Sequence, residues 1–345
     1  MAKRALVTGG SGFLGTEVTK RLLQKGWEVV VFDLNEPSQP DVNFIRGDIR
    51  DQAQCSLAVQ GVEVVFHNVA QVPLAKNKDL FDTVNIDGAR AILDASASAH
   101  VKSFVMTSSS AVFGLPKNLP ANKFSDLIPV EEYGRAKLAG EQQITDFHKS
   151  KMDISIIRPR TILSPGRLGL FSILFDWISK GLDVFVFGSG ENPYQFIHAK
   201  DLAAGLENAA DLKGFNTLNL GAMSYGSLRD ELEDLCSYAN TGSRVRSIPA
   251  GLVRNPLLAA SKIGLIPLAT YQLLLYSQAM YFDSSDDWER LSFSPIYSNK
   301  DCLRESYDWY KSNLNQVSGP KELSVHQKPA TGLSLKLFER FLRMI

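Results

Sequence analysis

The chain has 345 residues, 44% of them hydrophobic, which is enough to bury one large core or two coupled ones. Its 37 basic and 37 acidic residues balance, and with no long basic run they argue against nucleic acid as the main partner. The N-terminus runs directly into an apolar segment, so we expect no cleavable signal and a cytoplasmic location. Three widely spaced cysteines and five scattered histidines predict neither a disulfide framework nor a metal site.

The N-terminal segment has the pattern of a strand, a glycine-lined turn and a helix. The apolar run Ala5–Val7 precedes the turn, and the helical pattern stops at Gly26. Gly9 lets the chain turn off the strand, Gly12 lets backbone N–H groups approach a pyrophosphate, and Gly15 lets the helix lie close to the sheet. This arrangement predicts a dinucleotide site whose contacts in the turn are Gly9, Gly12, Phe13, Leu14 and Gly15.

The charge at the end of the second strand selects the cofactor. The run from Trp27 to Phe32 ends at Asp33, 24 residues after Gly9, where a carboxylate can accept both ribose hydroxyls of an adenosine. An anionic side chain would repel the 2′-phosphate of NADP, and no arginine follows immediately in Leu34, Asn35 or Glu36. The sequence therefore predicts NAD.

Short β-type runs alternate with helical ones through the first half of the chain. Such alternation predicts an α/β fold with a Rossmann-type, doubly wound parallel sheet, whose ligands bind at the carboxyl ends of the strands. The further strand-like runs begin near residues 42, 62, 104 and 154. After Pro165-Gly166 the pattern becomes irregular, with helices expected from Leu168 to Lys180, from an N-cap at Asp201 and from Leu228 to Tyr238, and a strand from Val184 to Phe187.

These changes divide the chain into domains. We expect an NAD-binding domain at residues 1–165, to which parts of 199–222 return. Residues 166–198 and 223–320 would form a smaller, interleaved substrate domain, and 321–345 a C-terminal tail with an amphipathic helix.

The chemistry is expected between residues 107 and 137. Tyr133 and Lys137 are four apart and therefore share a helical face. Tyr307 and Lys311 have the same spacing, but they lie in an aromatic-rich C-terminal helix, where packing is the expected role. Tyr133 instead lies 24 residues after Ser109, at the end of a predicted central strand, so the first pair is the catalytic candidate.

The motifs together resemble the extended short-chain dehydrogenase/reductase family, which contains nucleotide-sugar epimerases and 3β-hydroxysteroid dehydrogenases. The resemblance covers about residues 3 to 310 and rests on 8–15, Asp33, 47–48, 85–88, 107–114, Tyr133, Lys137 and 158–159. It implies that Asp48 and Ile49 flank the adenine, that Ala70 lies near the cofactor phosphates and ribose, and that Asn85 supports the active-site helix. A helix or turn cap is the alternative role for Asp48 and Asn85. The remaining implied cofactor residues are Tyr133, Lys137, Arg158 and Pro159.

The resemblance implies a mechanism in which Tyr133 is the base and Ser109 hydrogen-bonds the substrate oxygen. A free tyrosine has a pKa of about 10, and lowering it to about 7 requires roughly 4 kcal/mol, which Lys137 and the nicotinamide ring would supply. Lys137 would also hold the nicotinamide ribose. Counting back five residues from Gly114, as in the family's serine strand, selects Ser109; Ser108 and Ser110 are the alternates.

Departures from the family pattern narrow the activity. Ser110 and Ala111 stand where sugar 4,6-dehydratases carry two carboxylates, so dehydration is not expected. Phe113 replaces the usual tyrosine of sugar-modifying members, and the segment 192–196 lacks the arginine that many nucleotide-sugar members use against a diphosphate. Three cations could replace that arginine, although each also reads as a solvated surface charge: Arg160, Arg167 and Lys200.

These considerations predict an NAD-dependent nucleotide-sugar epimerase that inverts C4 of a UDP-sugar through a keto intermediate. The alternative is a 3β-hydroxysteroid-type dehydrogenase acting on a hydrophobic or lipid-linked alcohol, and a minor alternative is an NAD-binding regulatory protein without turnover. We expect a small-molecule substrate and a homodimer.

Two apolar segments raise the question of membrane contact. Residues 263–282 contain no charged side chain, but Pro267 and several polar residues interrupt them, which favours a buried or interfacial segment over a membrane span. Residues 331–345 interleave apolar and basic side chains, as in a helix that lies in a membrane interface or docks on protein.

Overall fold

The computed structural model describes residues 2–71, 82–147, 152–169, 171–249, 276 and 278–314. The chain divides into two compact units, each assembled from separate stretches of sequence. Unit 1 is formed by residues 1–161, 197–223 and 282–296, and unit 2 by residues 162–196, 224–281 and 297–345. Of the expected segment 263–282, residues 263–275 and 277 lie outside the described residues, as does the whole of the segment 331–345.

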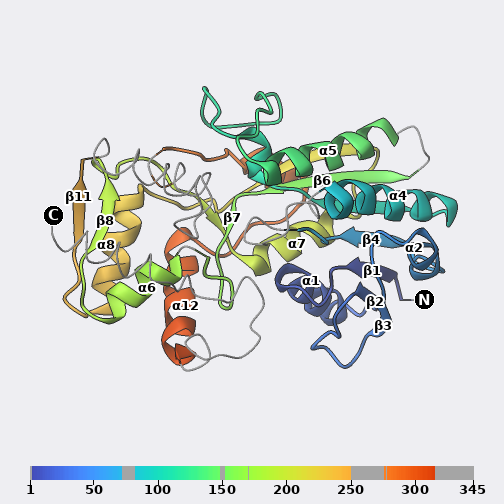
Figure 1. Ribbon diagram of the computed structural model, residues 1–345, viewed down its shortest axis with the longest axis horizontal. Helices are drawn as coiled ribbons and strands as arrows, with labels where there is room; N and C mark the ends of the chain where they lie inside the picture. Colours follow the sequence, from blue (N-terminus) through green and yellow to red (C-terminus); the bar gives the residue numbers. More distant parts are fainter. Residues whose placement is uncertain are drawn as a thin grey trace. The chain divides into compact units, whose positions relative to one another are not determined.

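A seven-stranded parallel sheet forms the centre of unit 1 (Figure 1). Its strand order is β10-β6-β5-β4-β1-β2-β3, and every neighbouring pair is parallel. The order reverses direction next to β1, as in doubly wound folds, so the expected Rossmann-type sheet is confirmed. Its strands are β1 (Arg4–Thr8), β2 (Glu28–Asp33), β3 (Asn43–Arg46), β4 (Val64–His67), β5 (Ser103–Thr107), β6 (Asp153–Pro159) and β10 (Phe215–Leu220).

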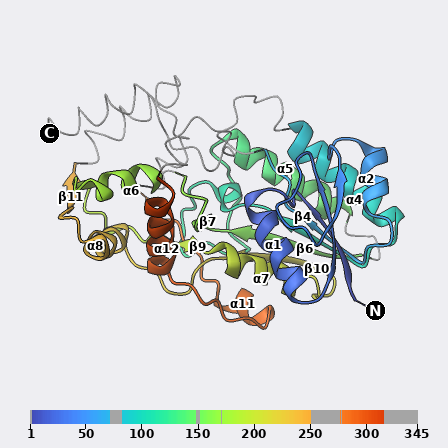
Figure 2. The same ribbon diagram turned by 90° about the horizontal axis from the view of Figure 1, so that it is seen from below.

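Helices cover both faces of this sheet. The helices α1 (Phe13–Gln24) and α7 (Ala199–Ala209) pack side by side on one face, as Figure 2 shows from below. The other face carries α2 (Gln52–Ala58), α4 (Gly88–Ser98) and α5 (Glu132–Phe147). Because both faces are covered, consecutive strand residues such as Ala5, Leu6 and Val7 are all buried, which explains why the strands read as unbroken apolar runs.

Short elements connect the layers of unit 1. A π-helical turn, η1 (Thr83–Asp87), leads into α4, and a 3₁₀ turn, η2 (Ser110–Phe113), follows β5. The helix α11 (Ser285–Arg290) belongs to a later stretch of the chain, yet it lies against β10: the Trp288 indole donates to the Gly221 carbonyl at 2.9 Å. Three separate stretches of sequence therefore complete one core.

Unit 2 is smaller and rich in aromatic side chains. Strands β8 (Val184–Phe187) and β11 (Val245–Ile248) pair in parallel. The helices α6 (Phe171–Ser179), α8 (Leu228–Ala239) and α12 (Asn299–Ser312) pack on one another, and Ser227 and Ser298 begin α8 and α12 with capping boxes. The two-residue strands β7 (Thr161–Ile162) and β9 (Phe196–Ile197) form a separate sheet.

Two expected helix starts are wrong. The helix α7 begins at Ala199 with His198 as its N-cap, because the His198 side chain accepts from the Lys200 amide; Asp201 lies inside the first turn. The carboxylate of Asp201 is used instead by a distant loop, where it accepts from the Ile296 amide at 3.1 Å. The helix expected from Leu168 begins as α6 at Phe171.

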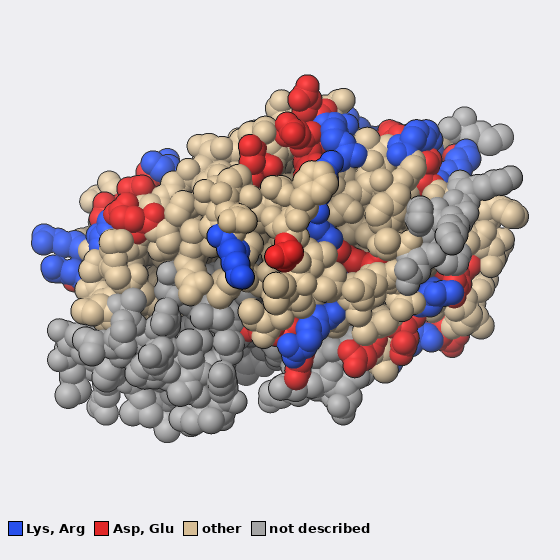
Figure 3. Space-filling view, turned by 90° about the horizontal axis from the view of Figure 1, so that it is seen from above, with Lys and Arg blue, Asp and Glu red and all other residues tan. Residues whose placement is uncertain are grey.

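Charge is mixed on the face of the molecule that Figure 3 shows. On the face in Figure 3, basic and acidic side chains alternate over the residues drawn in colour, as the equal numbers of the two kinds lead one to expect. Within the described part of the chain, no helix combines the length and the apolar character that crossing a bilayer requires.

Candidate active site

The turn between β1 and α1 has a geometry that only glycine allows at two positions. Gly9 has φ +69°, a left-handed conformation, and a Cβ on Gly15 would lie 2.0 Å from the Gly9 carbonyl oxygen. Gly12 is the N-cap of α1, with its amide bonded to the Gly9 carbonyl at 3.0 Å. The first helical turn therefore presses against the turn and directs its N–H groups beyond the carboxyl end of β1, a position suited to a pyrophosphate.

Asp33 is held beside this turn. One carboxylate oxygen accepts from the Ser11 amide at 3.1 Å, and the other accepts from the Asn35 amide at 2.9 Å. A carboxylate offers about four lone-pair positions, so each oxygen can still accept one further bond. The side chain is thus oriented, partly exposed and able to accept two ribose hydroxyls, and the residues of this region fit an NAD adenosine.

The residues expected near the adenine lie after β3. The Arg50 guanidinium donates to both carboxylate oxygens of Asp48, which holds the pKa of that carboxyl below its usual range. Ile49 is buried and lies so close to Gly88 that a Cβ there would approach the Ile49 Cγ2 atom to 2.7 Å. These contacts define a structural role for both residues, and their contact with adenine stays a prediction.

Asn85 joins two segments of the site. Its side-chain oxygen accepts from the Gln71 amide at 2.8 Å, and its side-chain amide donates to the Gln71 carbonyl at 3.2 Å. The segment that contains Ala70 is thereby fixed against η1. A Cβ on Gly140 of α5 would lie 2.8 Å from the Asn85 carbonyl oxygen, so η1 in turn lies directly against α5.

Tyr133 and Lys137 lie one turn apart on α5. Gly134, between them, approaches η2 so closely that a Cβ would lie 2.5 Å from the Ala111 oxygen, which places this end of α5 against the turn after β5. Lys137 is 2% exposed and donates to the Thr107 carbonyl at 2.9 Å. Burial lowers the pKa of Lys137 to about 8, while the nearby Glu141 carboxylate opposes the shift.

The three consecutive serines have different surroundings. Ser108 and Ser110 are buried: the Ser108 hydroxyl donates to Glu141, and the Ser110 hydroxyl accepts from Arg160 at 2.9 Å. Ser109 is partly exposed and is the N-cap of η2, where its oxygen accepts from the Ala111 amide. A hydroxyl in that arrangement still has a proton to donate. The geometry therefore favours Ser109 over both alternates as the substrate-facing serine.

Two side-chain hydrogen bonds connect the carboxyl ends of the neighbouring strands β1, β4 and β5. The Thr8 hydroxyl is 2.9 Å from the His67 Nδ1 atom, and the Thr107 hydroxyl donates to the Asn68 side-chain oxygen at 2.6 Å. Burial, assisted by the charge of Lys137, lowers the pKa of His67 to about 3, so its imidazole is neutral at physiological pH. These hydrogen bonds were not expected from the sequence, because the residues become neighbours only through strand pairing.

Two arginines at the end of β6, Arg158 within the strand and Arg160 just after it, have partners inside the protein. Arg158, expected to contact the cofactor, forms a buried ion pair with Glu141 at 2.6 Å, and its guanidinium lies 5.1 Å from the Phe113 ring centroid. Arg160 is only 1% exposed, so the solvated-charge alternative is wrong for this residue. Phe113 packs edge-on against Phe282. A direct role of Arg158 or Pro159 in cofactor binding stays a prediction.

The second Tyr-Lys pair belongs to unit 2 and has a packing role. Tyr307 is 1% exposed on α12, its ring lies edge-on to Phe175 at 5.8 Å, and Lys311 lies over it. In the segment 192–196, which lacks the expected arginine, the Tyr194 ring lies edge-on to Phe171 and tilted against Phe196.

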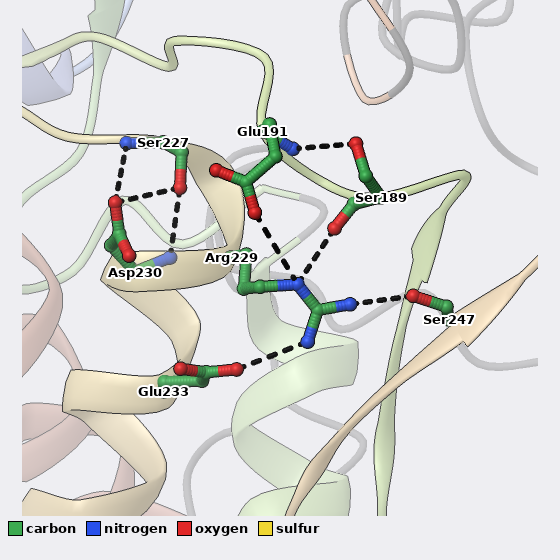
Figure 4. Close-up of polar contacts among 7 residues, drawn as sticks. All are labelled: Ser189, Glu191, Ser227, Arg229, Asp230, Glu233 and Ser247. Carbon is green, nitrogen blue, oxygen red and sulfur yellow. Dashed lines mark hydrogen bonds and ion pairs between the residues drawn. The ribbon is translucent and has the colours of Figure 1, made fainter.

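A cation of unit 2, Arg229, is fully engaged within the protein (Figure 4). Its guanidinium donates to the Ser189 carbonyl at 2.6 Å, to Glu233 at 3.0 Å and to the Ser247 hydroxyl at 2.5 Å. Arg246 and Arg304 are paired in the same way with aspartates. Each of these three cations therefore already has an acidic or polar partner within unit 2.

Comparison with known proteins places the chain in a family. The model of the NAD dependent epimerase/dehydratase family matches residues 5–221. Protein y4nG of Sinorhizobium fredii is 45% identical over all of this chain and 88% of its own length. A mouse sterol-4-alpha-carboxylate 3-dehydrogenase (decarboxylating) is 33% identical over 61% of this chain and 60% of the mouse enzyme. A putative UDP-glucose 4-epimerase of Methanocaldococcus jannaschii is 27% identical over 68% of this chain and 81% of that protein.

The fold has a counterpart among solved structures. UDP-glucose 4-epimerase from Thermotoga maritima, crystallised with UDP-glucose, superposes with a TM-score of 0.72 and 20% identity. The match covers 90% of this chain and 99% of the epimerase. At that level of identity, the similarity establishes the shared fold.

Proposed function

Since the chain belongs to the NAD dependent epimerase/dehydratase family, we propose that it oxidises a secondary alcohol to a ketone at Ser109, Tyr133 and Lys137. The observation that supports this most is the position of Lys137, which is buried, bonded to the Thr107 carbonyl and one helical turn from Tyr133. An ammonium group fixed there stabilises a phenolate nearby. The site thus combines a base with an oriented cation at the end of a central strand.

In this mechanism the alcohol loses a proton and a hydride. Tyr133, as phenolate, takes the hydroxyl proton, and Ser109 donates a hydrogen bond to the substrate oxygen as the carbonyl forms. When bound at the Gly9–Gly15 turn and Asp33, NAD supplies the hydride acceptor. Lys137 keeps its charge at neutral pH because its pKa of about 8 lies above that pH.

The substrate class has two candidates. A UDP-sugar would be oxidised at C4 and reduced again from the opposite face, which makes the enzyme a 4-epimerase. The similarity to the putative UDP-glucose 4-epimerase supports this outcome.

The second candidate is a hydrophobic, sterol-type alcohol that leaves the enzyme as a ketone. The higher identity to the sterol dehydrogenase supports it. It is also supported by the packed Phe113, where sugar-modifying relatives are expected to carry tyrosine, and by the lack of the expected arginine in the segment 192–196. More features of this chain therefore support the hydrophobic alcohol than the UDP-sugar.

The experiment is a substrate screen with purified full-length protein, covering UDP-hexoses, UDP-N-acetylhexosamines, uronic acids and sterols. A dehydrogenase accumulates NADH in proportion to ketone, whereas an epimerase regenerates its cofactor and inverts the sugar carbon. Stoichiometric NADH with a sterol supports the second candidate, and C4 inversion with only trace cofactor supports the first.

The base is tested in the same assay. We expect Tyr133→Phe to lower kcat by at least about 10²-fold while NAD still binds, since general-base contributions are of that size. The matched control is Lys311→Ala, in the pair with the same spacing, which should keep wild-type turnover. Near-normal turnover of Tyr133→Phe would remove Tyr133 from the mechanism.

A further inference from the structure

A buried ion pair lies behind the proposed catalytic residues. Glu141 and Arg158 have side chains only 4% and 7% exposed, and the guanidinium donates to both carboxylate oxygens, at 3.0 and 2.6 Å through Nε and Nη2. A third partner, the Ser108 hydroxyl, donates to the same carboxylate. The three side chains come from α5, β6 and the end of β5, so the cluster joins a helix to two neighbouring strands.

The sequence positions of this cluster connect it to the site. Glu141 follows Lys137 by four residues, and Lys137 follows Tyr133 by four, so all three lie along one face of α5. Ser108 immediately precedes Ser109. Any movement of Glu141 along the helix axis would therefore change the distance between Ser109 on one side and Tyr133 and Lys137 on the other.

We propose that Glu141, held by Arg158 and Ser108, is a positioning residue that fixes α5 against β5 so that Ser109, Tyr133 and Lys137 meet at one substrate oxygen. This inference rests on the proposed alcohol oxidation. Replacing a buried ion pair by apolar side chains is often neutral or stabilising, so stability alone is a weak reason for Glu141 and Arg158 to be charged. A stronger reason is the precise position of the catalytic groups, because a displacement of about 1 Å can cost about 10²-fold in rate.

Among the described residues, few other charges act on this face of α5. The helix packs against η1, η2 and α4, whose charged residues are the exposed Asp87 and Arg90 and the half-buried Asp94, and His67 of β4 is neutral. Glu141 is the carboxylate that acts on buried Lys137. Displacing Glu141 should therefore weaken the stabilisation of the Tyr133 phenolate by Lys137, and it should also disturb the positions of the catalytic residues.

The experiment compares Ser108→Ala with Ser108→Thr in the full-length protein. Both substitutions change a buried side chain, but only threonine keeps a hydroxyl that can donate to Glu141. We measure thermal unfolding, NAD affinity, kcat and KM. We also follow the ionisation of Tyr133, as the phenolate absorbance that Tyr133→Phe removes.

The expected result separates the two variants. Ser108→Ala lowers kcat by about tenfold and raises the pKa of the Tyr133 phenol, while KM and NAD affinity stay within about twofold of wild type. Ser108→Thr restores kcat and the wild-type titration. In a further variant, Glu141→Gln, the same changes are expected, and adding Ser108→Ala to it should cost little more, because both act through one contact.

Two results would overturn the inference. One is that Ser108→Ala and Ser108→Thr match each other in kcat and in the Tyr133 titration. The other is that Ser108→Ala loses thermal stability and NAD affinity in proportion to kcat, which a purely structural tie would cause. If the wild type oxidises no alcohol, the proposed function fails, whereas the titration of Tyr133 in the two variants still tests the positioning role.

Discussion

Gly15→Ala tests whether the close approach of α1 to the glycine turn is needed for cofactor binding. An alanine Cβ would lie 2.0 Å from the Gly9 carbonyl oxygen, whereas ordinary contact begins at 3.4 Å, so turn and helix must separate by 1.4 Å (3.4 − 2.0). The obstructing atoms are backbone, including the Gly10 Cα at 2.7 Å, and no side-chain rotation relieves them. The substitution therefore displaces the backbone itself.

The expected change in the free energy of unfolding of Gly15→Ala combines two opposing effects. Alanine in place of glycine within a helix ordinarily stabilises a protein by about 0.4–1 kcal/mol. Overpacking costs about 1–3 kcal/mol, so we expect a net loss of about 1–2 kcal/mol in the free energy of unfolding of the apo-protein. A shift of more than 1 Å in the turn should also weaken NAD binding by at least about tenfold.

Urea unfolding of apo-protein and titration with NAD measure the two effects separately. The control is Gly12→Ala, because Gly12 has φ −73° and a Cβ there would meet only the Gly9 oxygen, at 3.1 Å. We expect its apo-protein stability to stay within about 0.5 kcal/mol of wild type, with any loss confined to NAD binding. An apo Gly15→Ala protein as stable as wild type, with unchanged NAD affinity, would refute the argument.

Three further predictions concern charge. Because Asp33 disfavours a 2′-phosphate, apo-protein should bind NAD at least about tenfold more tightly than NADP, a difference of about 1.4 kcal/mol. Asp33→Ser should reduce this difference in affinity. Equal affinities of the wild type for NAD and NADP would remove the reason for naming NAD. The folded-state pKa of His67 is about 3 against 6.5 for a free histidine, so unfolded chains bind the extra proton between these values and stability falls as pH drops through that window. His67→Gln should make the urea unfolding midpoint depend less on pH over this range. An unchanged pH dependence would contradict the assignment of this effect to His67. Arg160→Met should cost about 1–3 kcal/mol by removing a buried, hydrogen-bonded charge, whereas Lys200→Met on the surface should stay within about 0.5 kcal/mol; similar losses in both would contradict the burial argument.

The parts of the fold that depend on local sequence were predictable. The glycine turn, the apolar strand runs and the Tyr133–Lys137 spacing each lie within a few consecutive residues, and their physical requirements are readable without knowledge of distant neighbours. The parallel sheet was predicted from the alternation of strand-like and helical runs, and the structure confirms it. The roles of Ser109, Tyr133 and Asp33 stay predictions, supported by the geometry around them.

The parts that depend on distant residues were not predictable. The residues around Asp201 predict a helix cap, but its carboxylate accepts a hydrogen bond from the amide of Ile296, 95 residues away. Arg160 reads as a surface charge, but strand pairing buries it beside Ser110. Glu141 had a signal that was overlooked: it continues the four-residue spacing of Tyr133 and Lys137 along one helix face.

The division of unit 1 among three stretches of chain has a consequence for how the protein can be made and shortened. Strand β6 is hydrogen-bonded on one side to β5 and on the other to β10, which is supplied by the stretch 197–223, and α11 reaches β10 from the stretch 282–296. A nascent chain that has emerged only to residue 165 would therefore present β6, whose residues Ile154–Pro159 are buried in the finished fold, as an open edge. Such an edge invites pairing with another chain until synthesis has passed residue 220. The same reasoning makes a fragment of residues 1–165 a poor substitute for the whole chain in cofactor-binding assays, since it would aggregate through the strand that carries Arg158.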